Sequence, residues 1–354
     1  MTTEDKVLNF AACVTDRCNR GCRHCLARAT DSGRKYLKPE WVRKLVLEAK
    51  DLGYKLQGDI SAMGEPLMNR DVVKIAEAFS GLKICRDIVF ITSGFLAKDK
   101  HEKNLFQELI TSNFNEVLSV NFSFNLYAPG FSERLLESVC AMFESGNFSR
   151  PYIRLVCDRN NYFDTINELI EVLHLIQVRT GMKWSTVMQD MPEEPRFKTF
   201  VSKYRRWEFS EEQELQWAGH ALSIPSIQRF ESEVRGQHYL FINVGLVSRI
   251  GRARNLSKTC FFGKNFRCQI LFNKKLEDAL YMSPDGGIFP DCNCVLGGLQ
   301  IGTWETPLQE LLARRRILHK NLLGKILSDR SLHWDREYPC ETCATLAKRN
   351  FSFV

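Results

Sequence analysis

Apolar residues in the first two thirds of the chain gather in short runs that alternate with segments of helical periodicity. The runs predict strands at 7–15, 56–62, 87–94, 117–125, 152–159 and 238–251. The segments between them predict helices near 39–51, 70–80, 102–112, 132–145 and 163–178. Largely apolar strands that alternate with helices are typical of an α/β fold with parallel βα units, packed as a barrel or as a doubly wound sheet.

This alternation is interrupted once and then ends. Residues 190–236 are charged and aromatic with a mostly helical pattern, and we interpret them as an insertion in the core and a candidate lid. After 255 the chain is dominated by cysteines, Gly-rich turns and short strands, followed by a basic helix at 306–328. The sequence therefore predicts a core domain at 1–255 and a small Cys-rich domain at 256–354.

Composition limits the classes of protein to which the chain can belong. Of 354 residues, 44% are hydrophobic and 26% charged, the balance of a water-soluble globular protein. No run of 18 apolar residues and no N-terminal signal segment is present, which predicts a cytoplasmic protein without a membrane span. The net charge of +7 suits an anionic ligand or RNA, and equally a solvated surface.

Thirteen cysteines are many for a cytoplasmic chain, where clustered thiols more often bind metal than form disulfides. Cys18, Cys22 and Cys25 follow the first predicted strand as CNRGCRHC. Thiolates are the ligands of iron–sulfur clusters, and three of them leave one iron of a cubane open for a further ligand. A structural zinc site would want a fourth Cys or His, and His24 lies between two ligands, where it could not easily chelate the same ion.

This cysteine spacing resembles that of the radical S-adenosylmethionine (SAM) superfamily. The resemblance implies a partial (β/α)6 barrel and a 4Fe–4S cluster whose open iron binds the amino and carboxylate groups of SAM. It also implies reductive cleavage of SAM to a 5′-deoxyadenosyl radical, which abstracts a hydrogen atom from the substrate. A non-catalytic iron–sulfur carrier is the alternative, but a carrier has no need of an open iron.

Further segments resemble the superfamily in the expected order along the chain. Ala62-Met63-Gly64-Glu65-Pro66 resembles its Gly-Gly-Glu-Pro segment, with Met63 in place of the first glycine, and this implies that Glu65 faces the SAM amino group. The other resemblances lie at the ends of later strands. Together they imply cofactor contacts from Gly64, Glu65, Pro66, Thr92, Ser93, Ser123, Asn125, Gly251 and Arg252.

The C-terminal cysteines resemble the auxiliary-cluster domains called SPASM and, in a shorter form, twitch. Gly287 to Cys292 fits a Gly-x4-Cys pattern, and the Asp-Gly-Gly turn before it predicts a β-hairpin. The resemblance implies one auxiliary 4Fe–4S cluster held by Cys268, Cys292, Cys340 and Cys343. Cys260 is an alternative ligand, Cys260 and Cys294 are candidate hydrogen-atom donors or unused thiols, and a structural zinc site is the alternative to the cluster.

The function that these resemblances imply is that of a radical SAM enzyme of oxidoreductase or epimerase type in natural product biosynthesis. Relatives with one auxiliary cluster act on amino sugars or on peptides, so we expect a small-molecule or peptide substrate and oxidation, epimerisation or cross-linking. The electron donor would be a flavodoxin or ferredoxin. The alternative is an RNA-modifying radical SAM enzyme, suggested by the helix that carries Arg314, Arg315 and Arg316. We expect these arginines on a solvated face, and nucleic acid is the less favoured partner.

Overall fold

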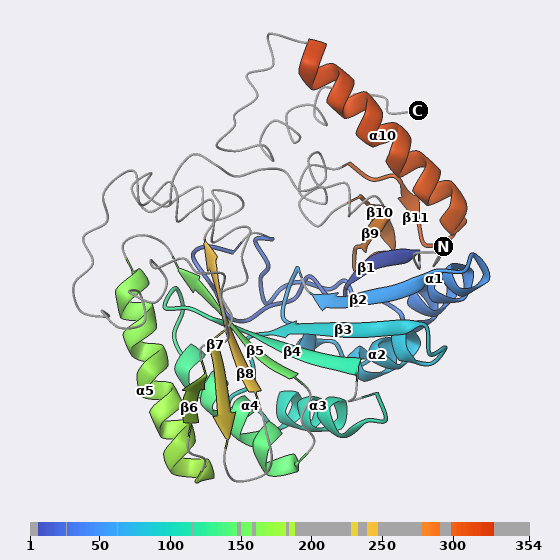
Figure 1. Ribbon diagram of the computed structural model, residues 1–354. Coiled ribbons are helices and arrows are strands. Elements are labelled where there is room, and N and C mark those ends of the chain that lie inside the picture. Colours follow the sequence, from blue (N-terminus) through green and yellow to red (C-terminus); the bar gives the residue numbers. More distant parts are fainter. Residues whose placement is uncertain are drawn as a thin grey trace.

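The computed structural model describes residues 6–25, 27–61, 63–114, 117–146, 150–157, 161–181, 184–187, 228–232, 239–246, 278–290 and 299–328. Its centre is a run of parallel strands in the order β1-β2-β3-β4-β5-β8 (Figure 1). Their bounds are Val7–Cys13, Lys55–Ser61, Cys85–Thr92, Leu118–Phe124, Arg150–Cys157 and Tyr239–Leu246. All six coincide with predicted strands, and the segment at 238–251 supplies the sixth parallel strand as expected.

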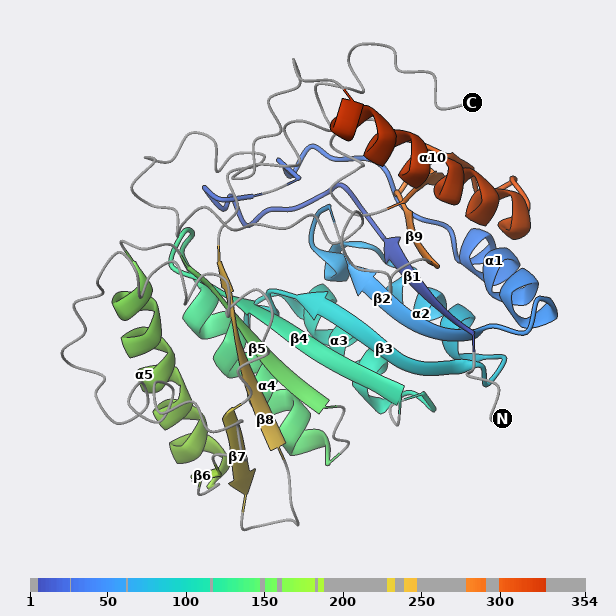
Figure 2. The same ribbon diagram turned by 45° about the horizontal axis from the view of Figure 1, so that its top comes forward.

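Five helices connect these strands and lie on one face of the sheet (Figure 2). They are α1 (Pro39–Asp51), α2 (Val72–Ser80), α3 (Lys100–Thr111), α4 (Phe131–Ser145) and α5 (Tyr162–Thr180). Each overlaps the predicted helix at its position. A single turn of 3₁₀ helix, η1 (Pro66–Met68), follows β2. The predicted α/β fold with parallel βα units is therefore confirmed.

The two faces of the sheet differ in polarity, because successive side chains of a strand point to opposite sides. On the helix side the strands bury aliphatic and aromatic residues, as where Phe10 of β1 packs on Phe79 of α2 with ring centroids 5.3 Å apart. On the other side the same strands carry Asp59, Asn121 and Arg154. The core thus forms between sheet and helices and leaves a polar face opposite.

The C-terminal part of the chain extends the same sheet. Strand β9 (Ala279–Met282) pairs in parallel with β1, and β10 (Gly287–Phe289) folds back antiparallel to β9. This is the hairpin that the Asp-Gly-Gly turn predicts, with Gly286 at a φ of +83°. Strand β11 (Gly302–Thr303) pairs with β10, and α10 (Leu308–Ser328) contacts α1. The boundary predicted near 255 lies outside the described residues and stays a prediction.

At the other edge of the sheet, two strands were not predicted from the sequence. They are β6 (Trp184–Val187) and β7 (Gln228–Ser232), which pair antiparallel with each other, and β7 pairs antiparallel with β8. The end of the predicted insertion therefore forms a sheet strand, and residues 190–227 and 233–236 lie outside the described part. Within that part, none of the helices is long and apolar enough to cross a membrane.

Candidate functional site

The three clustered cysteines lie in the loop between β1 and α1. Thr15 and Arg17 form isolated bridges with Tyr36 and Thr30, so the two ends of this loop run side by side. All three cysteines are half-buried. Burial raises the pKa of Cys18 to about 11, with a further rise from Glu65, and burial together with the two neighbouring thiols raises that of Cys22 to about 12. Thiols that repel one another as thiolates need a cationic partner to ionise together.

Three thiols are a donor set that fits a cubane cluster with one open iron. In the described part of the chain, no three His, Cys, Asp or Glu side chains are gathered tightly enough to hold one metal ion. Thiolates on different irons of a cubane lie farther apart than the ligands of one tetrahedral zinc. Cys13 is not available as a fourth ligand, because it is buried in β1, where its sulfur accepts from the Met63 N–H and its pKa is raised to about 12, chiefly by burial. The residues present fit a cluster with three protein ligands.

The segment after β2 lies directly against the cysteine loop. The Glu65 N–H donates to the Arg17 carbonyl oxygen at 2.9 Å. A methyl group at Gly64 would lie 2.0 Å from that same oxygen, so only glycine allows the approach. Glu65 then caps η1, accepting from the Leu67 N–H. The Gly64-Glu65-Pro66 segment and the cysteine loop are therefore one structural unit.

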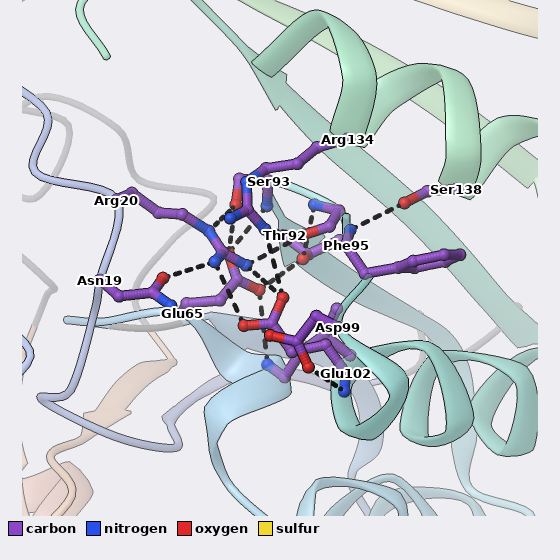
Figure 3. A network of polar contacts seen from close by, with 12 residues as sticks. Asn19, Arg20, Glu65, Thr92, Ser93, Phe95, Asp99, Glu102, Arg134 and Ser138 are labelled. Atoms are coloured by element: carbon purple, nitrogen blue, oxygen red, sulfur yellow. Dashed lines mark hydrogen bonds and ion pairs between the residues drawn. The ribbon is translucent and has the colours of Figure 1, made fainter. Parts of the chain in front are cut away.

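The Glu65 carboxylate is buried, with 3% of its side chain exposed. Its oxygens accept from the Thr92 hydroxyl, from the Ser93 N–H at 3.0 Å and from the Ser93 hydroxyl at 2.6 Å (Figure 3). The structure thus brings together Glu65, Thr92 and Ser93, which the sequence analysis placed in one site. A contact between the carboxylate and the SAM amino group stays a prediction.

Arg20 lies between the first two cysteines and was not predicted as a site residue, yet it joins the hydrogen-bond network of Glu65, Thr92 and Ser93. Its Nε–H donates to the Ser93 hydroxyl at 2.7 Å, and its terminal nitrogens lie 2.8 and 3.1 Å from the carboxylate oxygens of Glu102 in α3. Arg134 of α4 approaches the same carboxylate to 3.2 Å. Burial alone would lower the pKa of Arg20, but Glu65 and Glu102 raise it above its ordinary value. No local pattern pairs Arg20 with Glu102, because 82 positions separate them.

The other predicted cofactor residues divide into two groups. Ser123 is half-buried on β4, and Asn125, just after that strand, accepts from the Tyr127 N–H at 3.0 Å. Both lie at the end of a strand next to β3, which ends at Thr92. The remaining predicted residues lie outside the described part of the chain: Gly251, Arg252, Cys260, Cys268, Cys292, Cys294, Cys340 and Cys343.

The polar face of the sheet and the cysteine loop also carry buried side chains to which the sequence analysis assigned no role. The Oδ1 atoms of Asp59 and Asn121 and the Nδ1 atom of His24 are buried and have no hydrogen-bond partner. Burial raises the pKa of Asp59 to about 7, against the opposing effects of Ser61 and Arg154, and burial together with Arg154 lowers that of His24 to about 4. Unsatisfied buried polar atoms are costly, so such atoms are expected where a ligand binds.

Comparisons with known proteins agree with this geometry. Residues 13–180 match the family described as the Radical SAM superfamily. A probable GTP 3′,8-cyclase of Methanothermobacter marburgensis is 35% identical over 89 residues, which are 24% of this chain and 27% of that protein. The chain therefore matches only about a quarter of that relative.

Two solved structures of SuiB from Streptococcus suis share the fold. The structure bound to S-adenosylmethionine has a TM-score of 0.50 at 14% identity, and the alignment covers 92% of this chain and 68% of that one. The structure bound to the precursor peptide SuiA has a TM-score of 0.51 at 15% identity, over 97% and 73% of the two chains. The strand order, the three-cysteine loop and the family match lead to one conclusion: residues 13–180 of this chain are a radical SAM domain.

Proposed function

We propose that this chain is a radical SAM enzyme in which Cys18, Cys22 and Cys25 hold a 4Fe–4S cluster. The observation that carries the proposal is the contact of the cysteine loop with the Gly64-Glu65 segment, made by the Glu65 N–H and the Arg17 carbonyl. The bound cluster and SAM would supply the electron transfer and the carbon radical that acid–base chemistry cannot provide. The protein would hold SAM beside the loop through this segment, Thr92, Ser93, Ser123, Asn125, Gly251 and Arg252.

For the substrate we propose a polar small molecule or a peptide, changed by oxidation, epimerisation or bond formation. Asp59, Asn121 and Arg154 support this, because together they offer hydrogen-bond acceptors and a cationic donor on the polar face of the sheet. A peptide is supported by the related fold of SuiB, which has been solved with a precursor peptide. A flavodoxin or ferredoxin would supply the electron, and thiol ligation of iron fits a cytoplasmic location.

We further propose an auxiliary 4Fe–4S cluster on Cys268, Cys292, Cys340 and Cys343, with Cys260 as an alternative ligand. The β9–β10 hairpin supports this proposal, because it carries the chain along the edge of the barrel beside β1 shortly before Cys292. Cys260 and Cys294 are the thiols that we propose as candidate hydrogen-atom donors.

Anaerobic reconstitution followed by reduction with dithionite in the presence of SAM tests the function. We expect 5′-deoxyadenosine as a product and about eight irons per chain, since each cubane contains four. About four irons and one equivalent of zinc per chain would show that the C-terminal cysteines hold a structural zinc ion and no auxiliary cluster. Reconstituted protein that binds SAM but forms no 5′-deoxyadenosine under reduction would contradict the proposed function.

A further inference from the structure

Arg20 is a buried charge in an exposed turn. Its neighbours Asn19 and Gly21 are exposed, whereas Arg20 itself is 7% exposed. Its side chain points toward Ser93 and Glu65, which follow β3 and β2 (Figure 3). An arginine is almost never buried unless it is paired, so the partners that hold it there also hold the turn that separates Cys18 from Cys22.

Each of the five N–H donors of this guanidinium has an acceptor. The Nε–H donates to the Ser93 hydroxyl. One terminal nitrogen donates to Asn19 and Glu102, and the other donates to Glu102 and to the Gly94 carbonyl at 3.0 Å. Because the guanidinium is planar and rigid, five satisfied donors fix both its position and its orientation. A lysine has only three donors and could not reproduce this pattern.

All acceptor sites of the Glu65 carboxylate are occupied by hydrogen bonds of the same network. A carboxylate offers about four acceptor sites, and Glu65 receives the Leu67 N–H, the Thr92 hydroxyl, and the N–H and hydroxyl of Ser93. The Ser93 hydroxyl accepts from Arg20 and donates to Glu65, so it links the two charges in one chain of hydrogen bonds. Arg20 Nε also lies 3.7 Å from a Glu65 oxygen.

We propose that Arg20 is a positioning residue that fixes the cysteine loop on the barrel, and that the Glu65 side chain acts on SAM binding through Arg20. Only the second part of this inference, the effect on SAM binding, rests on the proposed function. Two arginines and two glutamates, Arg20, Arg134, Glu65 and Glu102, balance their charges within this buried cluster. This group of four charged side chains connects the cysteine loop to the segments that follow β2 and β3 and to helices α3 and α4.

Hydrogen exchange in the full chain, measured with and without the reconstituted cluster, tests the positioning role. The probes are the Cys18 N–H, which donates to Thr30, and the Glu65 N–H, which donates to Arg17. We expect Arg20→Lys and Glu102→Gln to speed exchange at both amides at least about tenfold, while amides in α5 stay as in the wild type. Arg23→Lys in the same loop is the matched control, since Arg23 is exposed. Unchanged exchange in Arg20→Lys would overturn the proposal.

A double-mutant cycle on the dissociation constant of SAM tests the path from Glu65. If Glu65 acts through Arg20, the losses of Arg20→Lys and Glu65→Gln will overlap, and the double variant will bind SAM about as weakly as the weaker single variant. If the fold-losses in SAM affinity of the two single variants multiply in the double variant, Glu65 acts on SAM independently of Arg20, and that part of the proposal is overturned. If the wild type bound no SAM, the proposed function would fail, whereas the exchange result would still decide the role of Arg20.

Discussion

Gly64 and Arg17 touch through their backbones: a Cβ on Gly64 would lie 2.0 Å from the Arg17 carbonyl oxygen and 2.6 Å from its carbonyl carbon. Both neighbours are backbone atoms, so no side chain can rotate away to make room. The contact joins the segment that follows β2 to the start of the cysteine loop.

Gly64→Ala is therefore expected to push the loop away from the barrel. The cost should be about 1–3 kcal/mol of unfolding free energy, the usual range for an added methyl group without space, together with weaker SAM binding. Thermal unfolding and SAM titration measure the two effects. Gly81→Ala is the control, because Gly81 has the backbone of a right-handed helix and its Cβ would lie 3.1 Å from the nearest atom. Equal effects of the two substitutions would show that the Gly64 contact has no special role.

Replacing Cys18, Cys22 and Cys25 together by alanine should remove one cubane and leave about four irons per chain. The formation of 5′-deoxyadenosine under dithionite should cease, because the iron that binds SAM is lost. Iron analysis and product chromatography check both results. Cys140→Ala, in the buried face of α4, is the control and should keep the full iron content. Continued SAM cleavage by the triple variant would refute the assignment of these ligands.

Asp59 is expected to make the protein less stable as the pH rises. In the unfolded chain this carboxyl ionises near its ordinary pKa of 3.8, whereas in the fold burial keeps it protonated up to about 7. Between these values the native state binds the extra proton, so stability falls with increasing pH, by on the order of a few kcal/mol in all.

Asp59→Asn should remove this dependence, since the amide has a similar shape and does not ionise. The difference in unfolding free energy between variant and wild type should increase from pH 4 to pH 8 in favour of the variant. Urea unfolding across this range measures it, with the exposed Asp51→Asn as the control. A difference that stays constant with pH would mean that Asp59 ionises normally in the fold.

The three consecutive arginines of α10 are not all exposed, in contrast to the prediction from the sequence. Arg315 is 3% exposed, so the prediction that all three arginines lie on a solvated face is wrong for this one. Arg314 pairs with Glu310, and Arg316 pairs with Asp278 at 3.0 Å. The burial of Arg315 and these two ion pairs reduce the free basic surface that suggested the RNA alternative.

Arg315→Gln should lower the unfolding free energy by roughly 1–3 kcal/mol, because it removes a buried charged group together with its interactions. Arg314→Gln and Arg316→Gln should each cost less than about 1 kcal/mol, as is usual for exposed ion pairs. Chemical denaturation of the three single variants tests this order. Three equal values would contradict the burial of Arg315.

Local sequence patterns were enough to predict the strands and helices of the core and to place the three cysteines in the loop after the first strand. Apolar runs and helical periodicity depend on which side of an element is buried, and that information repeats every two or every three to four residues. The same applies to the hairpin at Asp285-Gly286-Gly287, whose turn needs a glycine with a positive φ. Strands β6 and β7 were not predicted, because β6 is a short edge strand whose only partner among the described strands, β7, lies more than 40 positions further along the chain.

The tertiary structure alone decided which polar residues act together. Arg20 and Glu102 are separated by 82 positions, and Glu65 and Ser93 by 28, yet each pair is in contact because parallel strands end at one edge of the sheet. Burial raises the pKa of Glu102 and that of Asp59, and burial depends on packing against residues that no local pattern names. The sequence by itself determined the three-cysteine motif that we propose as the cluster ligands and the scaffold that carries it, whereas the fold decided what holds that loop in place.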